Sequence, residues 1–63
     1  MDEDQLNMGL RKFLKQVGVT SQQAIEALVR ERGLDHGSLK LRTVVTVEGQ
    51  DFEHVVEGKI DLG

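Results

Sequence analysis

The chain has 63 residues and a net charge of −3, with eleven Asp and Glu against eight Lys and Arg. So short a chain forms one domain and buries only roughly 60% of its unfolded surface, which makes a lone core marginal. It has no cysteine and two histidines, which excludes disulfides and disfavours a zinc site. We therefore expect no metal or cofactor, and oligomerisation remains as the means of stabilising so short a chain.

The charge is distributed unevenly. Residues 1–32 hold five acidic and five basic side chains, whereas residues 33–63 hold six acidic and three basic ones. Nucleic-acid binding rests on clustered positive charge, so this balance disfavours it. No apolar run approaches the roughly 18 residues of a membrane span, and no signal-peptide core is found. We expect a cytoplasmic protein with no membrane partner.

We predict that the first half of the chain forms two helices joined by a tight turn. Leu6, Leu10, Phe13, Leu14 and Val17 recur at helical spacing and predict a helix over about 3–17.

The residues that follow are typical of a helix end and a new start. Gly18 suits a C′ position with positive φ, and Thr20 suits an N-cap with Gln23 three residues on. Val19 can pack over the new helix against Ala24. We expect the second helix over about 21–32, closed by Gly33 at C′, with Ile25 on its inward face.

The first predicted helix has a basic face. Arg11, Lys12 and Lys15 lie opposite the apolar stripe, and Met8 falls among them. One interpretation is a solvated surface with a single apolar residue, since isolated exposed apolar residues are common. The other is a contact surface for an acidic protein partner.

The second half predicts a β-hairpin. A loop over 33–38 contains His36 beside Asp35, a pair without a third partner to suggest catalysis. Alternating apolar residues predict strands over about 39–48 and 52–62, with Gly49 in the turn. Gly58 within the second strand suggests a bulge.

The predicted fold is α+β: a two-helix hairpin, then a two-stranded antiparallel β-hairpin, completed by homodimerisation. The hairpin leaves unpaired edges, and pairing one of them with a second copy would give a four-stranded sheet. Val44 and Val55 on the outer face and His54 on the apolar face are the candidate self-association residues. The predicted core consists of Leu6, Leu10, Phe13, Leu14, Val17, Ile25, Leu28, Val29, Leu41, Val45, Val47, Phe52, Val56 and Ile60.

Several stretches resemble a family of short bacterial proteins that is classed as a domain of unknown function. They are Asn7-Met8, Arg11 to Lys15, Val17 to Gln22, His54 to Gly58, and Ile60. Gln23-Ala24 departs from the charged pair expected there, and the Gly33 to Leu39 loop also differs. The resemblance implies a bacterial cytoplasmic protein and carries over no activity or functional residue.

Three function classes follow. A small interaction or assembly protein that self-associates fits the short chain and the exposed strand edges. A winged-helix-like nucleic-acid-binding module would present Gln22, Gln23 and Arg30 on its second helix, but the hairpin is acidic where a wing is basic. An enzyme is disfavoured, because no nucleophile elbow, phosphate loop or metal-ligand spacing is present. We predict no catalytic residues.

Overall fold

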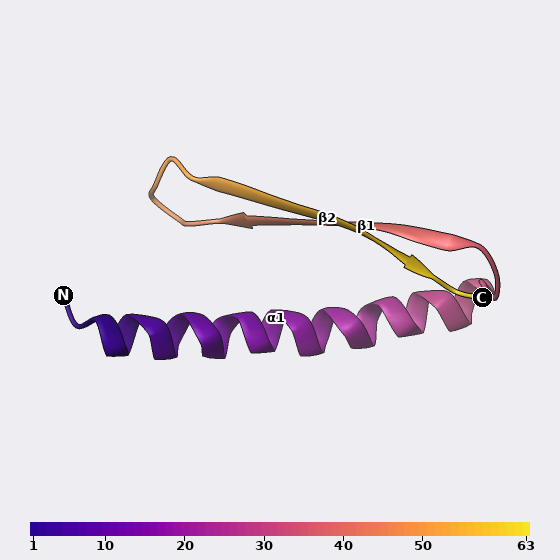
Figure 1. Cartoon of the computed structure of the whole chain (residues 1–63), viewed down its shortest axis with the longest axis horizontal. Helices are drawn as coiled ribbons and strands as arrows, with labels where there is room; N and C mark the ends of the chain where they lie inside the picture. The colour runs from indigo at the N-terminus through magenta and orange to yellow at the C-terminus, as the bar shows by residue number, and fades with distance from the viewer. The chain divides into compact units, whose positions relative to one another are not determined.

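The computed structural model describes residues 1–63 as one α-helix followed by two β-strands (Figure 1). The helix α1 spans Glu3–Arg32, and the strands are β1, Ser38–Thr46, and β2, Glu53–Asp61. The chain divides into two units, Met1–Gly33 and Leu34–Gly63, so that one unit contains α1 and the other the β-hairpin. The α+β class is confirmed.

Helix α1 is capped at both ends. The Asp2 carboxylate accepts a hydrogen bond of 3.1 Å from the Gln5 backbone N–H. Gly33 adopts the left-handed conformation, with φ 63° and ψ 36°, and its N–H donates to the Arg30 carbonyl. The acidic first turn and basic last turn also match the helix dipole. The predicted closure by Gly33 is confirmed.

The predicted two-helix hairpin is wrong, because α1 runs without interruption through residues 18–20 (Figure 1). Gly18 does not have positive φ, and Thr20 donates its hydroxyl to the Gln16 carbonyl, four residues earlier, at 2.7 Å. Thr20 is therefore an interior residue and not an N-cap. A glycine costs a helix only about 1 kcal/mol relative to alanine, and no proline is present to forbid continuation. The continuous helix can accommodate Gly18 at that cost.

The β-hairpin forms much as predicted. The antiparallel register pairs Ser38 with Asp61 at one end and Thr46 with Glu53 at the other. The strands are slightly shorter than the predicted 39–48 and 52–62. Gly49 has φ 79° in a turn where the Gln50 N–H donates to the Val47 carbonyl, which confirms its role.

Gly58 does not form a bulge. It pairs with Leu41 in a register that runs unbroken along both strands, and its φ is not positive. A Cβ built at Gly58 would meet no atom within 4 Å, so no close backbone approach accounts for the glycine either. Gly58 therefore adopts the ordinary strand conformation of its paired neighbours in β2.

None of the predicted core residues is buried. Val17, Ile25, Val29, Leu41 and Val45 are half-buried, and the other predicted core residues are exposed. The prediction assumed that two short helices fold back and cover each other's apolar faces. Because α1 is one straight element, its two halves cannot pack together in this way.

Candidate interaction surfaces

The first unit carries a stripe of mostly apolar side chains along α1. At about 100° per residue, its members recur on one side of the helix from Leu6 to Leu28. Phe13 near its middle is 52% exposed. We use the name apolar stripe for Leu6, Leu10, Phe13, Leu14, Val17, Ser21, Ala24, Ile25 and Leu28.

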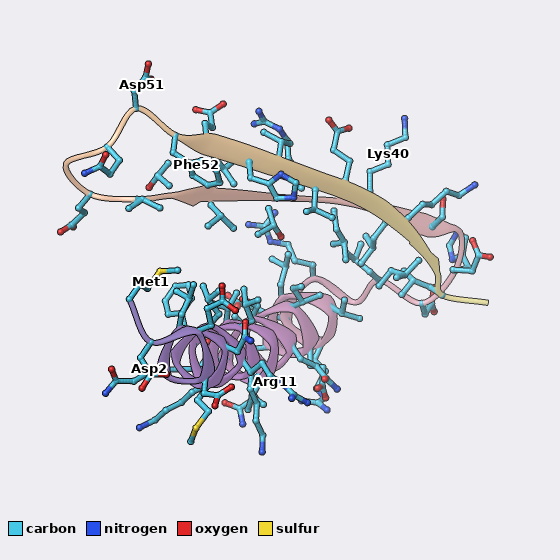
Figure 2. All side chains as sticks on the ribbon, turned by 60° about the vertical axis from the view of Figure 1, so that its left-hand side comes forward. Met1, Asp2, Arg11, Lys40, Asp51 and Phe52 are labelled. Carbon is cyan, nitrogen blue, oxygen red and sulfur yellow. The ribbon has the colours of Figure 1, made fainter.

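The predicted basic face is present on the other side of α1. Met8, Arg11, Lys12 and Lys15 are all exposed, and Met8 retains 73% of its accessible surface. Arg11 extends outward from the helix (Figure 2). None of the three bases forms an ion pair within the chain. The structure thus presents these four residues together, as their spacing predicted.

A shallow hollow lies within this basic face. Gln5, Met8, Gly9, Arg11 and Lys12 line it. A Cβ built at Gly9 would meet nothing within 4 Å, so the missing side chain leaves open space on the helix surface. The sequence reasoning missed Gln5 and Gly9, although Gln5 lies three residues before Met8 and Gly9 three residues before Lys12, a spacing that could have identified them.

The β-hairpin has two different faces. Val45 pairs with His54 and Thr43 with Val56, so these residues share the more apolar face. Val44 pairs with Val55 on the opposite face. The three predicted self-association residues therefore lie on two faces, as their alternation indicated, and Val55 is the only half-buried one.

The face with Val44 and Val55 is otherwise polar and charged. Arg42 lies opposite Glu57, and Lys40 lies opposite Lys59, a like-charge pair that disfavours the strand pairing locally. The Lys40 side chain projects away from the ribbon (Figure 2). The sheet has two strands only, so each strand has one unpaired edge. Charges beside such edges normally discourage further strand addition.

The two histidines do not come together. His36 Nδ1 lies 2.7 Å from the Asp35 carboxylate, and both side chains are more than four-fifths exposed. His54 is exposed within β2, opposite Val45. No group of three or more His, Asp or Glu side chains is arranged to hold a metal ion.

The ends of the hairpin unit are joined by backbone hydrogen bonds. The Leu62 N–H donates to the Gly37 carbonyl at 2.8 Å, and the Gly37 N–H donates to the Gly63 carbonyl at 3.4 Å. These bonds extend the pairing beyond the Ser38–Asp61 pair. The predicted 33–38 loop is thus partly drawn into the hairpin, with Gly37 at φ 83°.

These features define a small helix-and-hairpin protein whose apolar residues form surfaces and not an interior. No stretch of α1 combines the length and the apolar character that crossing a membrane requires. Residues 1–63 match a family described as "Family of unknown function (DUF6494)", and the chain belongs to that family. Neither a curated protein nor a solved structure matches the chain.

Proposed function

We propose that this protein is a small, non-enzymatic assembly protein that self-associates as a homodimer and offers its basic face to a further protein. The observation that carries the proposal is that no side chain is buried, while large apolar side chains are exposed on both α1 and the hairpin. Burial of apolar surface is the main favourable term in folding, and a second copy supplies it here.

The composition supports the same conclusion. A chain of 63 residues needs reinforcement, and it has no cysteine for a disulfide. A two-stranded hairpin by itself is marginally stable in water. Association of two copies can cover apolar surface in both units. A bacterial cytoplasmic setting, which the family resemblance implied, is part of the same proposal.

The basic face is the surface proposed for a partner. Arg11, Lys12 and Lys15 carry three positive charges without an acidic partner in the chain, and Met8 adds an exposed apolar group. An acidic helix or peptide with one apolar side chain has the complementary chemistry. The winged-helix alternative loses its main support, because the turn that it requires at residues 18–20 is helical.

Sedimentation equilibrium at several protein concentrations tests the self-association. We expect a single dimer species that dissociates on dilution. A species that stays monomeric up to millimolar concentration would overturn the proposal. Repeating the experiment in moderate salt separates apolar association, which salt leaves intact, from association between surface charges, which salt weakens.

A further inference from the structure

We infer that two copies pair through the apolar stripe of α1 with the helices antiparallel and centred near Val17. The inference rests on the proposed self-association and specifies its surface and orientation. Three features of α1 carry it: the spacing of its apolar residues, the distribution of large and small side chains along the stripe, and the charges at the helix ends.

The spacing is that of a helix-pairing surface. Leu6, Leu10, Phe13 and Val17 follow one another at intervals of four, three and four residues. Such alternation keeps one narrow side of a helix against a partner helix, as in coiled coils. Because α1 is continuous, the same side runs on through residues 20–28 without a break. The stripe therefore extends over about six turns, more than either predicted short helix could have provided.

The sizes of the side chains favour the antiparallel orientation. With Val17 facing its own copy, Phe13 lies opposite Ser21, and Leu10 lies opposite Ala24. Large side chains then meet small ones, which lets the two surfaces interdigitate.

A parallel arrangement in register has the opposite result. Phe13 would meet Phe13, while Ser21 and Ala24 would meet their own copies and leave empty space between the helices. Unfilled space in an apolar interface costs free energy because the lining atoms lose contacts. One antiparallel register, by contrast, matches both large-to-small pairs and also places Leu6 against Leu28.

The charges at the helix ends agree with this orientation. Residues 2–4 carry three carboxylates, whereas residues 30–32 carry two guanidinium groups and one carboxylate. Antiparallel pairing brings the acidic end of each helix to the net basic end of the other. Parallel pairing would bring the two acidic ends together, and it would also align the helix dipoles unfavourably.

One ion pair and one repulsive contact are expected at each end. At about 100° per residue, Glu3 and Arg32 lie on the same margin of the stripe, and the matching margins face each other in an antiparallel pair. Asp2 and Glu31 lie near the other margin, where their charges are alike. Such exposed charges select an orientation more than they add affinity.

Single cysteines test the orientation directly, because the chain has no cysteine of its own. The full-length variants are Leu6→Cys, Leu28→Cys and Val17→Cys, with Met8→Cys on the basic face as the matched control. After oxidation, Val17→Cys should give disulfide-linked dimer by itself. An equal mixture of Leu6→Cys and Leu28→Cys should give about tenfold more linked dimer than either alone, since a disulfide requires close Cα atoms. Met8→Cys should give little.

The outcomes separate this inference from the proposed function. A parent protein that is monomeric by sedimentation overturns both. A parent dimer in which Leu6→Cys links efficiently to itself indicates parallel helices and overturns the inference alone. A parent dimer in which no stripe variant links places the contact elsewhere, for example on the hairpin, and also overturns the inference while self-association stands.

Charge reversal provides a second measurement that does not alter the stripe. Glu3→Lys and Arg32→Glu should each raise the dimer dissociation constant roughly threefold to fivefold, because each places like charges together. The double variant, with both changes in one chain, should return it to near the parent value. A double variant no tighter than the single ones would contradict the antiparallel arrangement.

Discussion

Helix α1 and the β-hairpin are stabilised by different kinds of contact. The helix is defined by bonds between residues three or four positions apart and by its two caps, Asp2 and Gly33. The hairpin depends on pairing between residues as far apart as Ser38 and Asp61. Yet both units have apolar side chains exposed at their surfaces. Regular hydrogen bonding therefore completes the backbone of both units, while neither unit buries its apolar side chains.

The largest expected effect tests whether the apolar stripe of α1 is the contact surface. Phe13→Ala should weaken dimerisation by about 4 kcal/mol per dimer, because each of the two phenylalanines at an interface centre contributes at least about 2 kcal/mol. Met8→Ala removes an even more exposed apolar side chain from the opposite face and should leave the dissociation constant nearly unchanged. Sedimentation equilibrium measures both. Equal effects of the two substitutions would contradict the assignment of the stripe.

The next effect sharpens the description of α1 as one helix. Gly33→Ala should destabilise the helix by about 1 kcal/mol, because the left-handed conformation at the C-terminal end of α1 is unfavourable for alanine. Gly18→Ala should stabilise it by a similar amount, about 1 kcal/mol, since alanine is the better helix former and a Cβ meets nothing within 4 Å. Thermal unfolding followed by circular dichroism at 222 nm compares the variants. A less stable Gly18→Ala protein would mean a turn at that position.

The hairpin offers the corresponding pair of glycines. Gly49 has φ 79° in the turn, so Gly49→Ala should destabilise the hairpin by about 1–2 kcal/mol. Gly58 lies in a regular strand with open space around it, and Gly58→Ala should stabilise the hairpin by about 0.5–1 kcal/mol. Hydrogen exchange of the Val44 and Val55 amides reports the change within the hairpin. We expect Gly49→Ala to lower the stability of the hairpin and Gly58→Ala to raise it. A loss of stability in both variants would indicate that Gly58 is required for close packing.

The smallest effect concerns the surface of α1. Arg30 and Glu26 form an ion pair of 3.2 Å at i,i+4 spacing, with both side chains substantially exposed. Glu26→Gln should lower the stability of the helix by about 0.3–0.5 kcal/mol, and high salt should remove the difference. Glu31→Gln, which breaks no ion pair within the chain, is the matched control. A loss that persists in 1 M NaCl, roughly a 3 Å screening length, would point to a contact other than charge.

The sequence predicted the hairpin better than the helix. Alternation of apolar residues assigned Val45 and Val56 to one face and Val44 and Val55 to the other, and the register agrees. A strand side chain changes face at every residue, so an error in alternation is easy to detect. Gly49 and Gly33 were also assigned correctly, because only glycine readily takes positive φ at a turn or helix end.

The error at Gly18 came from signals that fit two structures. Glycine followed by Thr20 is typical of a helix end and a new N-cap, but threonine can also bond its hydroxyl to a carbonyl four residues earlier, as it does here. The predicted basic face survived this error, because Met8, Arg11, Lys12 and Lys15 all precede Gly18. The predicted core did not, since it required the two halves of the helix to face each other.

The sequence by itself determined the C-terminal end of the helix, the turn glycine, the two faces of the hairpin and the grouping of bases around Met8. Each depends on residues close in the chain or on strict alternation, where one conformation is favoured by its local chemistry. Only the tertiary structure decided that residues 3–32 form one helix and that the apolar residues remain at the surface. A break at Gly18 would create two new helix ends whose backbone groups lack intrahelical partners, whereas continuation costs only about 1 kcal/mol for the glycine, and α1 continues.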